Sequence, residues 1–124
     1  MLLDSFAWME YFMGTKKGEK VKKSVDDDVQ LYTSPIVIAE IYSKSLRTDG
    51  RADERKDFIM KRCATVVIDA NIAVEAAKIH AENKALVPDF GLADAFILAT
   101  ARSRKIKVLT GDSHFKDCSD AVML

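Results

Sequence analysis

The sequence predicts an α/β fold with three layers, α/β/α, built around a short-stranded, mainly parallel central sheet. Short runs of apolar and β-branched residues alternate with helical stretches of ten or more residues, a pattern typical of parallel βαβ units with right-handed crossovers. Of the 124 residues, 48% are hydrophobic, which is enough to enclose one core. No internal repeat or low-complexity linker divides the chain. We therefore expect a single domain over residues 1–124.

The N-terminal segment is expected to form a short strand and two helices. Residues Met1–Leu3 are apolar, and Asp4 can cap a helix whose apolar residues recur at helical spacing up to Gly14. The charged segment 15–28 has only two valines, four residues apart, as an apolar edge. We interpret this segment as a surface helix.

The next strand and helices are signalled by turn and cap residues. Residues 29–33 are of β-forming types, and Ser34 followed by Pro35 supplies an N-cap and a proline at the first helical position. This pair predicts a helix from residue 36 to about residue 46. After an Asp-Gly break, residues 53–63 form a second amphipathic stretch.

The remaining elements complete the alternation. Residues Thr65–Ile68 are mostly β-branched and are expected to form the third strand. Asp69 can cap a helix over residues 72–84, and an alanine-rich helix is expected over residues 92–104. Lys107–Thr110 is then the fourth strand.

Charge and cysteine content exclude several classes of function. The chain has 19 basic and 19 acidic residues, so it has no bulk positive field and any contact with nucleic acid must be local. Cys63 and Cys118 lack the spacing of a zinc site or a disulfide framework. The apolar runs are too short to span a bilayer, and Asp4 interrupts the N-terminus without a basic signal region. A cytoplasmic protein without a membrane segment is therefore expected.

Four acidic residues are expected to meet at one edge of the sheet. Asp4 directly follows the first strand, and Asp112 follows the fourth strand after one glycine. Asp94 lies in the first turn of its helix, near the positive end of the helix dipole. Because ligands of open parallel sheets bind at the carboxyl ends of the strands, these positions are informative. Glu40 lies among apolar residues of a helix, where a buried charge needs compensation.

A divalent cation would supply that compensation. Mg²⁺ prefers oxygen ligands and can be held by a few carboxylates together with substrate phosphates. Such an ion lowers the pKa of a bound water and stabilises charge on a phosphate under attack. The hydroxyls of Ser5 and Thr110 could position that water. The acids therefore suggest metal-dependent hydrolysis of a phosphodiester.

Each acid also has a purely structural interpretation. Asp4 and Asp94 can act as helix caps or first-turn acids, Asp112 as a turn residue, and Glu40 as an ion-pair partner of Lys44. No Ser or Cys carries a nucleophile signature that would pair with a histidine, and we expect His80 and His114 to be surface or packing residues.

Four segments together resemble a known family. They are Leu2–Ser5, Ser34–Glu40, Leu92–Ala101 and Leu109–Asp112. In their order and spacing they resemble PIN-domain proteins, specifically VapC-type toxins, over essentially the whole chain. The family's catalytic and metal-binding acids correspond to Asp4, Glu40, Asp94 and Asp112.

The resemblance carries further implications. It implies a PIN-like fold and an endoribonuclease that depends on Mg²⁺ or Mn²⁺ and leaves a 5′ phosphate, with the hydroxyl of Thr110 before the last acid. It also implies a homodimer and a cognate antitoxin whose C-terminal segment covers the active site. His114 departs from the family, whose members often carry a further aspartate there. Asp117 is a candidate substitute, and contributions from Asp89 and Ser5 stay open.

Three other interpretations are compatible with parts of the pattern. A phosphoacceptor receiver domain has a similar length, but its paired acids after the first strand are absent here and the middle segment reads as helical. A non-catalytic module that binds RNA or protein is opposed by the intact set of four acids. A PIN-type nuclease in RNA maturation or DNA processing, outside any toxin pair, stays open because substrate choice depends on surface shape.

Overall fold

A computed structural model describes all residues from 1 to 124 and contains one five-stranded sheet. The strands are β1 (Leu2–Leu3), β2 (Leu31–Thr33), β3 (Cys63–Thr65), β4 (Val108–Thr110) and β5 (Ala121–Met123). Their order across the sheet is β3-β2-β1-β4-β5, and every neighbouring pair is parallel. The predicted α/β class with a short-stranded parallel sheet is therefore confirmed.

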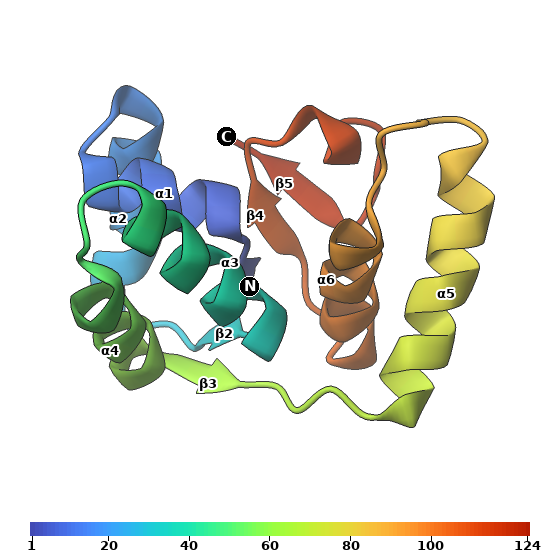
Figure 1. Cartoon of the computed structure of the whole chain (residues 1–124), viewed down its shortest axis with the longest axis horizontal. Coiled ribbons are helices and arrows are strands. Elements are labelled where there is room, and N and C mark those ends of the chain that lie inside the picture. Colours follow the sequence, from blue (N-terminus) through green and yellow to red (C-terminus); the bar gives the residue numbers. More distant parts are fainter.

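Six α-helices flank the sheet. They are α1 (Ser5–Met13), α2 (Lys16–Asp26), α3 (Pro35–Arg47), α4 (Ala52–Arg62), α5 (Ala70–Lys84) and α6 (Leu92–Ser103). In Figure 1, α1 to α4 lie to the left of β4 and β5, while α6 and α5 lie to the right, with α5 outermost. None of these helices combines the length and the apolar composition that crossing a bilayer requires.

Three helices begin where the sequence signals predict. The side chains of Asp4, Ser34 and Asp69 accept hydrogen bonds from the backbone N–H groups three residues later, at the starts of α1, α3 and α5. At the other end of α1, Gly14 has a φ of +67°, the left-handed conformation that glycine adopts without strain. Local chemistry therefore fixes where the chain enters each helix.

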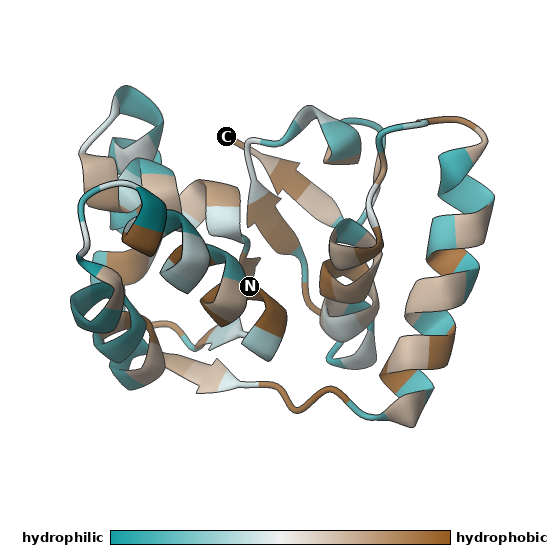
Figure 2. Ribbon diagram, viewed as in Figure 1, coloured by the Kyte–Doolittle hydropathy of each residue, from teal (hydrophilic) through white to brown (hydrophobic).

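The core lies between the strands and the helix faces turned toward them. Leu2, Leu3 and Trp8 are fully buried, and β4 is buried along its whole length. In Figure 2, β4 and β5 are coloured as hydrophobic, whereas most of α4 is coloured as hydrophilic. This contrast matches a sheet that is covered by amphipathic helices.

The third and fifth strands differ from the sequence expectation. β3 occupies Cys63–Thr65 and not Thr65–Ile68, because β2 ends at Thr33, where Ser34 turns the chain into α3. Only one further ladder bond forms, from the N–H of Val66 to the carbonyl of Thr33. β5 was not predicted at all. It is a three-residue edge strand that depends on pairing with β4.

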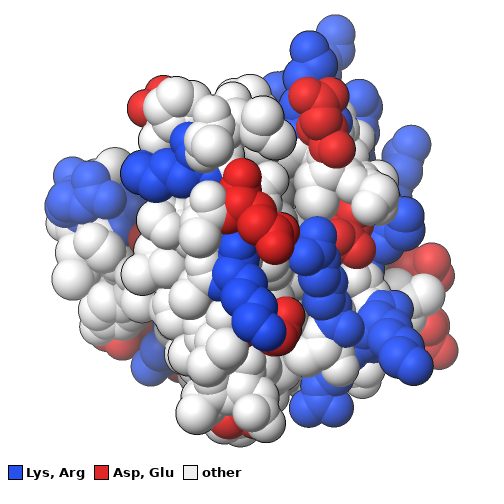
Figure 3. Space-filling model, turned by 90° about the vertical axis from the view of Figure 1, so that its right-hand side faces the viewer, with Lys and Arg blue, Asp and Glu red and all other residues white.

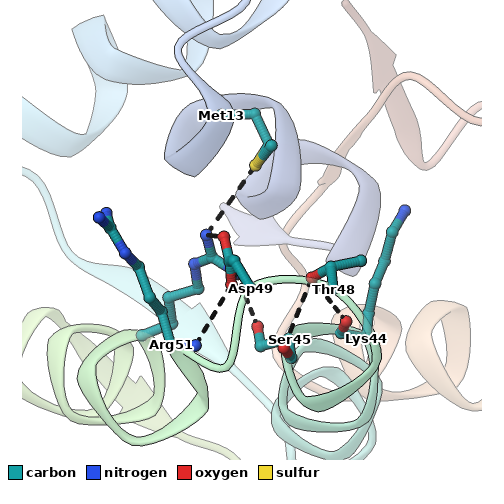
Figure 4. A network of polar contacts seen from close by, with 7 residues as sticks. Met13, Lys44, Ser45, Thr48, Asp49 and Arg51 are labelled. Carbon is teal, nitrogen blue, oxygen red and sulfur yellow. Dashed lines mark hydrogen bonds and ion pairs between the residues drawn. The ribbon is translucent and has the colours of Figure 1, made fainter.

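The buried Arg55 forms hydrogen bonds that stabilise the connection between α3 and α4 (Figure 4). The Arg55 guanidinium donates to both carboxylate oxygens of Asp49, at 2.9 and 2.6 Å, and to the Ser45 hydroxyl at 3.0 Å. It also lies 3.9 Å from the sulfur of Met13, at the end of α1. The bidentate contact with Asp49 holds the loop between the two helices, and the bond to Ser45 connects α4 to α3, the helix that carries Glu40.

Basic and acidic side chains are mixed on the face formed by α5 (Figure 3). On this face Lys and Arg lie among Asp and Glu, and no continuous basic surface is visible. The mixture agrees with the equal numbers of basic and acidic residues. Long-range attraction of a polyanion to this face is therefore not favoured.

Candidate active site

The topology of the sheet brings β1 and β4 together. The chain runs from β1 outward through β2 and β3, then returns to place β4 on the other side of β1. Leu3 is in register with Leu109, and the N–H of Asp4 donates to the carbonyl of Leu109. The strand order reverses at this pair, which is the topological switch point where ligands of such sheets bind.

Asp4 lies at this switch point and is almost completely buried. Only 3% of the residue is exposed, and its carboxylate accepts a hydrogen bond from the N–H of Ala7. The pKa of Asp4 is raised to about 7, mainly by burial and in addition by the charges of Asp112 and Glu40. Hydrogen bonds from the Thr110 hydroxyl and the Ala7 N–H oppose this rise. The carboxylate therefore lacks a compensating positive group.

Glu40 reaches the same region from α3. Burial raises its pKa, interaction with the Ser5 hydroxyl lowers it, and the charges of Asp94 and Asp112 raise it again. Its Oε1 atom is buried and has no hydrogen-bond partner. A buried oxygen without a partner is costly, and a bound cation or water would satisfy it.

Asp94 is held in the first turn of α6. Its Oδ2 atom accepts a hydrogen bond of 3.0 Å from the N–H of Gly91, the residue that precedes the helix. The same oxygen lies 3.1 Å from Nδ1 of His114. Asp94 therefore caps the start of α6, as expected of a first-turn acid, and also lies within the acidic cluster.

Asp112 is positioned by the turn after β4. Its N–H donates to the Thr110 hydroxyl at 2.9 Å, and its Oδ1 accepts from the N–H of His114, also at 2.9 Å. Gly111 is required before it, because a β-carbon there would overlap the ring of Phe6. The close approach of Phe6 therefore sets the path of the chain that carries Asp112.

His114 belongs to this cluster, contrary to the sequence expectation of a surface or packing residue. Its Nδ1 lies 3.1 Å from Asp94 and 3.5 Å from Oδ1 of Asp112. The side chain is only 29% exposed. The signal in the sequence was its place two residues after Asp112, in the turn that follows β4.

The acidic residues fall into two groups. Donor atoms of Asp94, Asp112 and His114 all lie within 4.8 Å of one another. Asp4 and Glu40 are outside that group. The charge of Asp112 raises the pKa of Asp4, and the charges of Asp94 and Asp112 raise the pKa of Glu40. Asp89 and Asp117 are exposed and do not join the group. Ser5 contributes through its interaction with Glu40.

A hollow of about 500 Å³ adjoins the cluster. It is lined by Ser5, Phe6, Met9, Ala39, Glu40, Ser43, Lys44, Arg47 and Asp112. Glu40, Lys44 and Arg47 follow one another at spacings of four and three residues, so they occupy one face of α3. The side chains of Lys44 and Arg47 make no ion pair or hydrogen bond within the chain, which leaves two free cations beside the acids.

The site and fold define an α/β domain with an acidic centre at the switch point of a parallel sheet. A family model described as the PIN domain matches residues 1–120. The chain therefore belongs to the PIN-domain family. No curated protein matches it in sequence.

Solved structures of toxin–antitoxin proteins share this fold. A toxin–antitoxin complex from Klebsiella pneumoniae superposes with a TM-score of 0.79 at 21% identity, covering 98% of this chain and 95% of that one. VapC20 from Mycobacterium tuberculosis, described as a toxin that cleaves the sarcin–ricin loop, gives 0.77 at 16% identity, covering 99% and 97%. VapBC2 from Rickettsia felis, bound to promoter DNA, gives 0.75 at 13% identity, covering 99% and 96%.

Proposed function

We propose that this chain is a metal-dependent endoribonuclease and the toxin of a toxin–antitoxin pair. The observation that carries the proposal is the convergence of Asp94, Asp112 and His114, whose donor atoms lie within 4.8 Å, beside the buried Asp4 and the half-buried Glu40. Membership of the PIN-domain family and the toxin–antitoxin structures that share the fold support it.

The residues present fit a divalent cation. Glu40 has a buried oxygen without a partner, and Asp4 is a buried carboxylate without a positive neighbour. The proposed ligands of Mg²⁺ or Mn²⁺ are Asp4, Glu40, Asp94 and Asp112. A bound cation would lower the pKa of a water molecule and stabilise charge on the phosphate that is attacked.

The remaining residues orient the reactants in this proposal. The Thr110 hydroxyl holds the Asp112 backbone and interacts with Asp4, so it fixes the two strand ends relative to each other. Lys44 and Arg47 would bind phosphates of the RNA backbone next to the acids. In the proposed reaction water loses a proton as its oxygen bonds to phosphorus, the bond from phosphorus to the 3′ oxygen breaks, and that oxygen takes up a proton, which leaves a 3′ hydroxyl and a 5′ phosphate.

A protein partner follows from the same proposal. The solved structures that share this fold include complexes of toxins with antitoxins. A nuclease of this kind must be held inactive in the cell, and a cognate antitoxin covering the acidic centre would do so. We further propose a homodimer that acts in the cytoplasm.

Cleavage of RNA by purified, antitoxin-free protein tests the proposal. Single-stranded and structured RNAs are incubated with Mg²⁺, Mn²⁺ or EDTA, and the products are separated on a denaturing gel. We expect metal-dependent cleavage in the wild type and in the control Asp57→Asn, an exposed acid of α4, and none in Asp94→Asn. Equal, EDTA-resistant cleavage by wild type and Asp94→Asn would indicate a contaminant. No cleavage of any RNA would favour a binding module.

A further inference from the structure

We infer that His114 is itself a ligand of the cation, through Nδ1, and that this nitrogen makes the site select Mn²⁺ over Mg²⁺. The inference rests on the proposed function, because it concerns the same acidic centre. It adds a donor that is not an acid and gives the centre a definite metal preference.

The distances support ligation. Donor atoms bound about 2.1 Å from one ion lie roughly 3.0 Å apart at a right angle and roughly 3.4 Å apart in a tetrahedron. His114 Nδ1 lies 3.1 Å from Asp94 Oδ2 and 3.5 Å from Asp112 Oδ1. The distances from this nitrogen to the two carboxylates therefore match those between atoms that bind the same ion.

The backbone that carries His114 is fixed by its surroundings. The backbone N–H of His114 donates to Oδ1 of Asp112, in a short 3₁₀ turn over Ser113–Phe115. The next residue, Phe115, is 1% exposed and packs edge-on against Phe90, with ring centroids 6.1 Å apart. The buried neighbour therefore holds the His114 backbone beside the cluster, which reduces the entropy lost when the side chain binds an ion.

The chemistry of nitrogen donors then determines the preference. Mg²⁺ takes oxygen ligands almost exclusively, whereas imidazole nitrogen suits transition-metal ions. Ligation through Nδ1 requires the tautomer with its proton on Nε2, so that Nδ1 offers a lone pair. The alternative is a hydrogen bond in which Nδ1–H donates to Asp94 and the ring only positions that carboxylate.

Pulsed electron paramagnetic resonance distinguishes these two roles. The chain has two histidines, so Mn²⁺ bound to protein without a histidine tag reports on only two imidazoles. Electron spin echo modulation from ¹⁴N is expected in the wild type and in the control His80→Ala, and is expected to vanish in His114→Ala. Bound Mn²⁺ without nitrogen modulation in the wild type would overturn the inference.

Metal affinities provide a second test that does not depend on His114→Ala. Free Mn²⁺ is followed by its resonance signal while Mg²⁺ displaces it, in the wild type and in His114→Asp. We expect the preference for Mn²⁺ over Mg²⁺ to fall by about tenfold or more in His114→Asp. An unchanged preference would overturn the inference.

RNA cleavage is measured in the same samples to separate the two proposals. Metal-dependent cleavage without nitrogen modulation would overturn the role of His114 and leave the nuclease proposal intact. Absence of both Mn²⁺ binding and cleavage would overturn both. Nitrogen modulation without cleavage would support the inference about His114 and contradict the nuclease proposal alone.

Discussion

Oδ2 of Asp94 accepts a hydrogen bond from the N–H of Gly91 and lies 3.1 Å from Nδ1 of His114, 20 residues later in the chain. One carboxylate therefore connects the start of α6 with the turn that follows β4. In the proposed metal site it would have two separable functions, because the hydrogen bonds need an acceptor oxygen, whereas a cation needs negative charge.

Asp94→Asn and Asp94→Ala should separate these functions. Asparagine keeps an acceptor for Gly91, so we expect its loss of stability to be small, whereas alanine removes the cap and should cost about 1 kcal/mol. Both variants should lose the stabilisation that Mn²⁺ gives the wild type, which is about 2.7 kcal/mol at a hundredfold excess over Kd. Urea unfolding with and without Mn²⁺ measures both effects. Full stabilisation of Asp94→Asn by Mn²⁺ would contradict the ligand role.

The buried carboxyl of Asp4 should make the metal-free protein less stable as pH rises. Its pKa is raised from 3.8 to about 7 in the folded state, so the folded protein binds more protons than the unfolded chain between these values. The corresponding stability is complete below pH 4 and is lost as pH rises through 7. Asp4→Asn should therefore gain roughly 2–4 kcal/mol relative to wild type between pH 4 and pH 8.

Denaturant unfolding in EDTA at several pH values checks this expectation. Asp57→Asn is a suitable control, because its side chain is 60% exposed and pairs with Lys56 on the surface. A stability difference between Asp4→Asn and wild type that does not change with pH would mean that Asp4 ionises normally in the folded protein.

Lys44 and Arg47 should contribute to RNA affinity through phosphates. They line the hollow beside Glu40 on one face of α3, and neither side chain forms an ion pair within the chain. In the cleavage-deficient background Asp94→Asn, replacing either residue by alanine should weaken binding of single-stranded RNA. It should also reduce the slope of log K for binding against log salt concentration by about 0.7 in magnitude.

Fluorescence anisotropy at several salt concentrations measures this slope. Lys78→Ala is the matched control, since it removes one positive charge from α5, where Lys78 pairs with Glu75. If all three alanine variants changed RNA affinity equally, the hollow beside Glu40 would not be the RNA site.

Gly111 and Phe6 should be energetically coupled. A β-carbon at residue 111 would overlap the Phe6 ring, so Gly111→Ala should cost about 1–3 kcal/mol. Phe6→Ala opens the space. The loss of unfolding free energy in the double variant should therefore be smaller than the sum of the two single losses by about 1 kcal/mol. Additive losses in a double-mutant cycle of unfolding free energies would show that the contact does not constrain the turn before Asp112.

The parts predicted from sequence were those with local causes. The caps Asp4, Ser34 and Asp69 signal themselves through residue type, because their side chains bond within one turn of the chain. The meeting of Asp4 and Asp112 followed from topology, since both lie just after strands of a parallel sheet. One rule about strand ends was therefore enough to bring them together.

The parts that were missed depend on contacts that residue patterns do not encode. Strand β5 exists because Ala121–Met123 pairs with β4, and three residues are too few to show a periodicity. The position of β3 was predicted wrongly, because the residues that form this strand are those that pair with β2, and β2 ends at Thr33. His114 was expected to be a surface or packing residue, because its contact is with Asp94, which lies on a different element.

The central claim is that the carboxylates at the switch point bind a divalent cation, and a crystal soaked in Mn²⁺ tests it most directly. An anomalous difference map should show a peak within about 2.0–2.3 Å of carboxylate oxygens of Asp94 and Asp112, and of His114 if it is also a ligand. The peak should be absent in Asp94→Asn crystals treated in the same way. A map with no peak at these residues, or with Mn²⁺ bound only elsewhere on the surface, would contradict the account.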